Sequence, residues 1–177
     1  MRKTLIMATV AGVILFASCQ NAGSGNAAAT DSTAAPVETK QERNKKVVMA
    51  SNEAMMKKDI DGVFSYGADN FIDYGDGSMP AMTNKDSIKQ MMNMWMSAFP
   101  DFKAEDLQYY ADGDNVIVYG VYSGTWTGDM MGQKGNGKSF KTADMDIFTL
   151  NEDGKITSHR NIQNWGAVMA MQLGVKM

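Results

Sequence analysis

The chain has 177 residues, a length that suits one folded domain with processing segments, and its sequence does not repeat at a fixed period. It contains 17 basic residues, 20 acidic residues, one histidine and one cysteine. The single cysteine excludes an internal disulfide, and the acidic balance disfavours nucleic acid as a partner.

The N-terminal segment has the build of a secretory signal peptide. Arg2 and Lys3 precede an apolar run over residues 5–16, which is short for a membrane span and ends in small residues. Residues 15–19 resemble the lipobox of bacterial lipoproteins, with Phe16 where leucine is usual. The resemblance implies that Cys19 is lipidated and anchors the protein to a membrane of the bacterial cell envelope. The alternative is an ordinary signal peptide that ends near a cysteine.

These features divide the chain into three parts. Residues 1–18 are the predicted signal peptide, and without them 15 basic residues stand against 20 acidic ones, a formal charge of −5. Residues 19–38 hold the cysteine and a flexible tether, because alanine, glycine, serine and threonine bury too little apolar surface to order a segment. Residues 39–177 form the predicted domain, which is long enough for one core with a small pocket.

The first half of the domain is predicted to be mainly helical. Thr39 and Glu42 form a capping-box pattern, and an amphipathic helix follows with Val47, Ala54 and Met55 on its apolar side. We then expect a short helix over 60–66, a strand over 71–74, a loop around Pro80, and a third helix from Thr83 or Asn84 to Phe99.

The second half alternates extended segments with turn signals. Strands are expected over 102–111, 116–126, 140–150 and 156–164, which are rich in β-branched and aromatic residues. Asp-Gly and Asn-Gly pairs between them are typical of hairpin turns. Helices early and strands late favour an α+β fold, in which about three N-terminal helices cover one face of a curved antiparallel sheet. An apolar hollow between helices and sheet is expected to hold a small molecule.

Several short motifs occur in the order and spacing of one known family. They are Phe99-Pro100-Asp101-Phe102, Gly113-Asp114-Asn115-Val116, Gly124-Thr125-Trp126-Thr127-Gly128, Met131-Gly132, Gly137-Lys138, Asp146-Ile147-Phe148, Asp153-Gly154-Lys155-Ile156 and Gln172-Leu173-Gly174. Together they resemble the SnoaL-like polyketide cyclase family, within the nuclear transport factor 2-like superfamily of cone-shaped α+β folds. The resemblance covers nearly all of residues 39–174. It implies the fold and a homodimer formed through the outer face of the sheet, whereas such folds host several reactions and proteins without catalysis.

The family's catalytic position is changed in this chain. In the family's enzymes, an aspartate at the end of the last strand is the general acid and base for ring closure. The resemblance carries that position to Asn164, whose amide has no proton equilibrium near neutral pH. The spacing from Asn164 to Gln172-Leu173-Gly174 is one residue longer than the family's. We therefore expect a domain that binds a small, largely apolar molecule without the cyclase reaction.

Three more positions differ from the family pattern. Trp126 and Tyr74 stand where histidine is common, and Arg160 stands where the last strand often has tryptophan. With Trp95 of the third helix and Asn164, these are the residues that we expect to line the ligand pocket.

Two acidic residues on the strand over 140–150 are the candidate catalytic groups. Alternation along the strand puts Asp144 and Asp146 on one face with Phe140 and Phe148. Two nearby carboxyls can raise the pKa of one of them, which gives an acid–base catalyst of the isomerase, lyase or cyclase type, with Arg160 as a charge partner. The alternative is that one carboxylate is solvated and the other binds Arg160.

The only histidine is expected to have no role in chemistry. His159 alternates away from Arg160 and Asn164, so we expect it on the surface. One histidine without a nucleophile in a recognisable frame favours neither a catalytic triad nor a zinc site. We therefore expect no cofactor and no metal.

Overall fold

The computed structural model describes residues 37–176, so the predicted signal peptide, Cys19 and nearly all of the tether lie outside the described residues. No helix within 37–176 is long and apolar enough to cross a bilayer. The elements are α1 (Lys40–Met56), α2 (Ile60–Ser65), β1 (Gly67–Asp73), α3 (Lys85–Ala98), β2 (Lys103–Asp112), β3 (Asn115–Thr125), β4 (Ser139–Leu150), β5 (Ile156–Asn161), α4 (Trp165–Val168) and the π-helix η1 (Met169–Leu173).

The longer helices begin at side-chain caps that the sequence predicts. Thr39 and Glu42 form the capping box of α1: Glu42 N donates to Thr39 Oγ1 at 3.2 Å, and Thr39 N donates to Glu42 Oε2 at 2.9 Å. Asn84 caps α3 by accepting a hydrogen bond from Ser87 N at 2.9 Å. Both predicted helix starts are confirmed. A cap joins residues only a few positions apart, so it can be predicted from the sequence alone.

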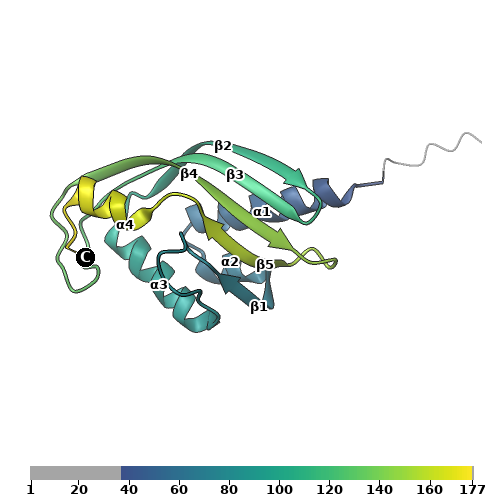
Figure 1. The fold of residues 1–177 in the computed structure, drawn as a ribbon, viewed down its shortest axis with the longest axis horizontal. Coiled ribbons are helices and arrows are strands. Elements are labelled where there is room, and N and C mark those ends of the chain that lie inside the picture. The colour runs from purple at the N-terminus through teal and green to yellow at the C-terminus, as the bar shows by residue number, and fades with distance from the viewer. Residues whose placement is uncertain (1–36, 177) are drawn as a thin grey trace, which may run out of the picture. The chain divides into compact units, whose positions relative to one another are not determined.

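Five strands form one curved sheet in the order β1-β5-β4-β3-β2 (Figure 1). β2, β3, β4 and β5 pair antiparallel, as predicted. β1 pairs parallel with β5, so the sheet is mixed rather than wholly antiparallel. A parallel pair needs a long connection between its strands, and here most of the domain separates β1 from β5 along the chain.

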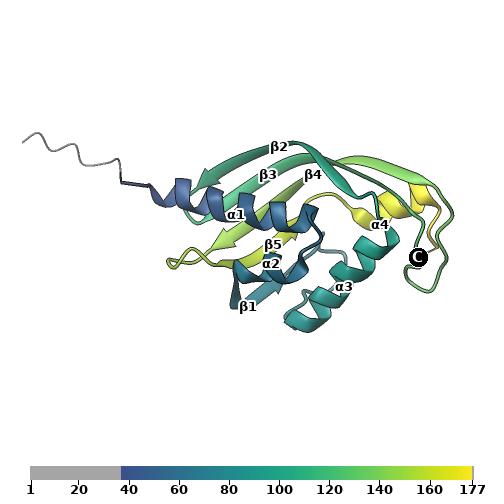
Figure 2. The same cartoon turned by 180° about the vertical axis from the view of Figure 1, so that it is seen from behind.

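Helices α1, α2 and α3 lie against the concave face of the sheet (Figures 1 and 2). α1 contributes Val48 to a buried cluster with Val116 of β3, and Phe99 after α3 packs in a second cluster with Phe140 of β4. α2 and α3 share a third cluster. The α+β architecture that the sequence predicts is confirmed.

The buried side of α1 differs from the predicted one. Asn44, Val48 and Ser51 are buried, whereas Val47 is only partly buried. Asn44 is fully buried, and its Nδ2 donates to the Gly113 carbonyl oxygen at 3.2 Å, which ties α1 to the β2–β3 turn. A prediction from the spacing of apolar residues does not find this side, because two of its three buried side chains are polar.

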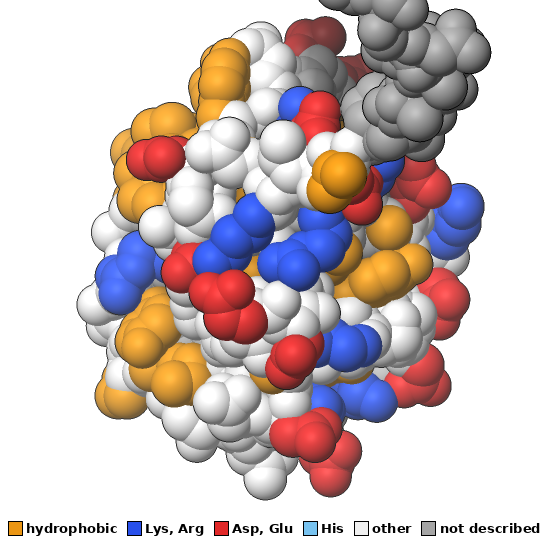
Figure 3. Space-filling view, turned by 90° about the vertical axis from the view of Figure 1, so that its right-hand side faces the viewer, with side chains coloured by type: hydrophobic (Ala, Val, Ile, Leu, Met, Phe, Trp, Pro, Cys, Tyr) orange, Lys and Arg blue, Asp and Glu red, His pale blue; other side chains and the backbone are white. Residues whose placement is uncertain are grey.

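Ion pairs join the start of α1 to neighbouring turns of the sheet. Lys40 Nζ lies 2.8 Å from Glu152 Oε1 and also contacts Asp114, while Arg43 Nη1 donates to the Glu152 carbonyl oxygen at 2.9 Å. Figure 3 shows acidic and basic side chains interspersed over this side of the domain. Solvent screens exposed pairs of this kind, so they contribute little to the stability of the domain.

The last strand ends three residues earlier than predicted. β5 stops at Asn161, and the chain turns into α4 and η1. Asn164 caps α4, with its Oδ1 accepting from Ala167 N at 2.8 Å. Gly174 then ends η1 with φ of 74°.

Candidate functional site

The inner face of the sheet carries a line of buried polar contacts. His159 Nδ1 lies 3.1 Å from Asp73 Oδ1, and His159 Nε2 lies 3.2 Å from Asp146 Oδ1. The Tyr122 hydroxyl donates to Asp146 Oδ2 at 2.5 Å. These residues belong to β1, β5, β4 and β3, so the line crosses four of the five strands. We call Asp73, His159, Asp146 and Tyr122 the polar line.

The strand register explains why His159 faces inward. Phe148 is the partner of His159, and Asp146 is the partner of Asn161, so the odd-numbered residues of β5 share the face of the even-numbered residues of β4. The side chain of His159 is 19% exposed. The prediction that His159 lies on the surface is wrong, because alternation separates the two faces of a strand and register decides which one is covered.

Asn161 joins the two candidate acids. Its Nδ2 donates to Asp146 Oδ1 at 2.6 Å and to Asp144 Oδ2 at 3.2 Å. The Asp144 carboxylate also accepts from Trp165 Nε1 at 2.8 Å. Three backbone N–H groups complete its hydrogen bonds, those of Met145 at 2.7 Å, Gln163 at 2.8 Å and Ile162 at 3.3 Å.

The carboxylates hold His159 in its charged form. Burial on its own lowers the pKa of His159, but the hydrogen bonds to Asp146 and Asp73 outweigh burial and raise that pKa to about 10. Burial opposes ionisation of Asp73, yet the hydrogen bond from His159 brings the pKa of that carboxyl below its usual range. His159 is therefore an imidazolium at neutral pH, and each of its ring nitrogens donates to a carboxylate.

Two neighbours of Asp146 have raised pKa values. Burial, followed by the charge of Asp146, raises the pKa of the Tyr122 hydroxyl, which stays protonated and donates. Burial and the charge of Asp146 also raise the pKa of Asp144, against the hydrogen bonds that favour its ionised form. A raised pKa is what an acid–base catalyst requires, so Asp144 retains one property of the predicted catalytic group.

The polar atoms of this network are paired. Among the buried side-chain nitrogen and oxygen atoms of residues 37–176, Ser123 Oγ alone lacks a hydrogen-bond partner. Asp146 accepts hydrogen bonds from an imidazole, a hydroxyl and an amide. Its carboxylate therefore joins side chains of β3 and β5 across β4.

Arg160 lies on the opposite face from both acids. It is the partner of Ile147 in the β4–β5 register, and its guanidinium lies 4.7 Å from the centroid of the Tyr74 ring. The stacking is a cation–π contact on the outer side. The predicted pairing of Arg160 with Asp144 or Asp146 is therefore wrong. The β4–β5 register places Arg160 on the face opposite to the two acids.

The other predicted pocket residues are also dispersed. Trp126 is 2% exposed within the core, and its Nε1 donates to the Gly128 carbonyl oxygen at 2.8 Å. Asn164 is exposed at the start of α4. Trp95 is partly buried, and its ring packs against that of Trp165. The structure thus brings Asp144 and Asp146 together but does not gather the five pocket residues around one cavity.

Aromatic rings fill the space between α3 and the sheet. The Trp95 ring lies 4.5 Å from the Phe99 ring and 5.5 Å from the Trp165 ring, measured between centroids. Phe140 lies 5.4 Å from Trp165. The chain's own aromatic side chains therefore occupy this part of the predicted hollow.

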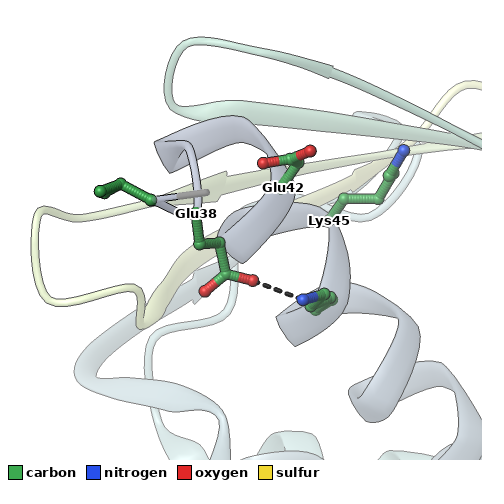
Figure 4. A pocket seen from close by; sticks show the side chains of 5 residues that line it. Glu38, Glu42 and Lys45 are labelled. Atoms are coloured by element: carbon green, nitrogen blue, oxygen red, sulfur yellow. Dashed lines mark hydrogen bonds and ion pairs between the residues drawn. The ribbon is translucent and has the colours of Figure 1, made fainter. Parts of the chain in front are cut away.

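Two surface depressions border α1. The first, of about 410 Å³, has a largely charged lining at the start of α1, where Glu38 lies 2.6 Å from Lys46 (Figure 4). The second, of about 230 Å³, lies between α1 and β2 and is called the α1–β2 groove below. The groove is lined by Asn52, Glu53, Met56, Lys57, Leu107 and Tyr109. Neither depression includes a residue predicted for the pocket.

Sequence reasoning misses four members of the network: Asp73, Tyr122, Asn161 and Trp165. One signal was present, because alternation places Asn161 on the same face as His159. Nothing local links Asp73 to His159, since 86 positions separate them along the chain. Only the β1–β5 pairing makes them neighbours.

The sequence over residues 45–171 matches the model of a family described as SnoaL-like polyketide cyclase. The chain belongs to this family. The match covers most of the described helices and strands, and it confirms the family that the short motifs indicate. A comparison with curated proteins found no match.

Solved structures share the fold of this SnoaL-like domain. A protein assigned as a SnoaL-like polyketide cyclase from Jannaschia sp. CCS1 is 18% identical with a TM-score of 0.68, over 77% of this chain and 95% of that one. One assigned as a polyketide cyclase from Xanthomonas campestris is 19% identical with a TM-score of 0.66, over 75% and 98%. An NTF2-like protein from Burkholderia xenovorans is 16% identical with a TM-score of 0.60, over 75% and 97%. At these identities the likeness establishes the fold alone.

Proposed function

We propose that this chain is an envelope lipoprotein whose SnoaL-like domain binds a small, largely apolar molecule without the family's cyclisation. The observation that carries the proposal is the hydrogen bonding of the two candidate acids. Asp146 accepts from three side chains, and Asp144 accepts from two side chains and three backbone N–H groups. A ligand that hydrogen-bonds to either acid would have to displace one of these donors, at a cost of about 1–3 kcal/mol for each buried donor left unpaired.

The changed family position supports the same proposal. Asn164 has no carboxyl group, and its side chain is engaged as the cap of α4. A ligand is supported by the α1–β2 groove, which joins apolar side chains to a few polar groups, the usual character of a small-molecule site.

A second candidate function is an acid–base enzyme of the isomerase, lyase or cyclase type that uses Asp146 or Asp144. The polar line favours it, because a charged His159 joins two carboxylates beside a tyrosine hydroxyl. Titratable groups with strongly shifted pKa values gather at catalytic sites more often than elsewhere.

A thermal-shift screen against hydrophobic carbonyl compounds, followed by turnover assays on each hit, separates the two candidates. We expect binding without turnover. Turnover that is lost in both Asp146→Asn and Asp144→Asn, with folding retained, would overturn the binding proposal in favour of the enzyme. If no compound raises the melting temperature, the ligand-binding proposal fails.

We also propose that two copies of the domain pair through the outer face of the sheet. Tyr110, Ile117 and Ile147 are cross-strand neighbours in one row of that face, and Met145 lies in the next row. The exposed fractions are 56% for Tyr110, 37% for Ile117 and 43% for Met145. A two-fold interface uses the same patch on both subunits, so one apolar face is sufficient to make it.

A further inference from the structure

The α1–β2 groove depends on a bulge in β2. The β2–β3 register shifts between Glu105 and Gln108, and Asp106 has a φ of 56°. One extra residue reverses the alternation, so Ala104 and Leu107 both face inward although they are three positions apart. Without the bulge, the side chains that form the sheet side of the groove would point to the outer face.

Gly120 on β3 makes room for Leu107. A Cβ atom at Gly120 would lie 2.6 Å from Leu107 Cδ2, so any other residue would displace that side chain. The same point is 3.4 Å from Tyr122 Cε2. Leu107 therefore forms the inner wall of the groove, and the ring of Tyr122 lies behind it.

The Tyr109 hydroxyl is a hydrogen-bond donor on the sheet side of the groove. Asn52 Nδ2 donates to the Tyr109 hydroxyl oxygen at 3.3 Å. This bond occupies an acceptor position of the oxygen, and among the described residues the Tyr109 proton has no protein acceptor. A phenol that receives one hydrogen bond is well placed to donate another to a ligand oxygen.

The size and lining of the groove restrict the ligand. Its volume of about 230 Å³ is below the roughly 300–1,000 Å³ of sites for drug-sized molecules. Leu107 and the ring of Tyr109 form apolar walls, and Met56 is a flexible thioether that adapts to different shapes. A compact molecule of one or two rings matches both properties.

We propose that the α1–β2 groove binds a compact, flat, largely apolar molecule with a carbonyl oxygen, which accepts a hydrogen bond from Tyr109. The inference rests on the proposed binding function and places it away from the aromatic interior. It adds Met56, Leu107 and Tyr109 to the chain as ligand-contacting residues.

The test uses 1-tetralone, a two-ring aromatic ketone, and tetralin, which has the same rings without the carbonyl group. Binding to the SnoaL-like domain is followed by amide chemical shifts. Tyr109→Phe should weaken tetralone binding about fivefold and leave tetralin binding unchanged. Met56→Trp should fill the groove and weaken both ligands at least tenfold. Gly120→Ala should also weaken the binding of both ligands, because the added methyl group would push Leu107 into the groove.

Met91→Trp is the matched control, because Met91 is an exposed methionine on α3 that lines neither depression. It should leave both affinities unchanged. A different outcome is that tetralone shifts the amide resonances around Trp95 and Trp165 and binds Met56→Trp as tightly as the wild type. In that outcome the groove is the wrong site, and the binding function stands. If tetralone does not bind at all, this inference is overturned, and the separate carbonyl screen decides the binding function.

Discussion

His159 Nε2 lies 3.2 Å from Oδ1 of Asp146, and the opposite ring nitrogen lies 3.1 Å from Asp73. One cation thus joins the edge strand β1 to the centre of the sheet through β5 and β4. A buried charge is tolerated only when it is paired and hydrogen-bonded, and this imidazolium has two carboxylate partners.

The first prediction concerns the stability of the domain at alkaline pH. The pKa of His159 is raised to about 10 in the folded state, against about 6.5 in an unfolded chain. The stabilisation is therefore complete below pH 6.5 and is lost as pH rises towards 10. The free energy of unfolding should fall by up to about 1.4 kcal/mol per pH unit in this window. Urea denaturation at pH 6.5 to 9 measures it.

His159→Gln is the control for that slope, because glutamine does not titrate in the same window. Its free energy of unfolding should be lower at pH 6.5 and nearly flat towards pH 9. Identical pH profiles for the wild type and the variant would show that His159 does not carry the effect.

The second prediction concerns the role of Asp146. Asp146→Asn should lower the free energy of unfolding by about 3 kcal/mol, because it removes one partner of a buried ion pair. It should leave ligand affinity unchanged. Asp69→Asn, at an exposed position, is the charge-matched control and should cost less than about 0.5 kcal/mol. A loss of turnover without a loss of stability would instead assign Asp146 to catalysis.

The third prediction concerns the filled interior. Trp95→Ala should cost about 3 kcal/mol, since it removes a large ring packed against Phe99 and Trp165. Indole should restore part of the melting temperature by occupying the vacated space. Indole should leave the wild type unchanged. Equal stabilisation of both proteins would mean that the interior already has room for a ligand.

The fourth prediction concerns the outer face of the sheet. Ile117→Lys places a charge in the middle of the apolar row and should convert a dimer into a monomer. Met91→Lys changes a similarly exposed residue on α3 and should leave the dimer intact. Light scattering coupled to size-exclusion chromatography gives the mass. A monomeric wild type at about 100 µM would refute the proposed pairing.

The fifth prediction concerns the anchor. Cys19→Ser should abolish incorporation of a labelled fatty acid and release the protein from the membrane fraction, because the predicted lipidation site is lost. Ser18→Ala leaves the cysteine in place and should retain both properties. A Cys19→Ser protein that kept the lipidated mature mass would contradict the lipoprotein assignment.

Local signals in the sequence were sufficient for most of the fold. Capping residues marked the starts of α1 and α3, and turn pairs separated strands whose residues suit a half-buried sheet. Such signals act over a few residues, so they can be read without knowing the partners in space. The grouping of Asp144 and Asp146 on one face follows from alternation alone and was also predicted.

The sequence was enough to predict the family, the order of elements from α1 to β5, and the position of the two acids on one strand face. The helices α4 and η1 at the C-terminal end were not predicted. Which face of the sheet is covered, and which two carboxylates His159 contacts, depended on the packing of the strands. His159 and Asp73 are 86 positions apart, and the parallel register of β1 and β5 brings them together. Likewise, the bulge at Asp106 turns Leu107 inward and forms the groove. Register and packing are properties of strands in contact, and a single strand's sequence does not contain them.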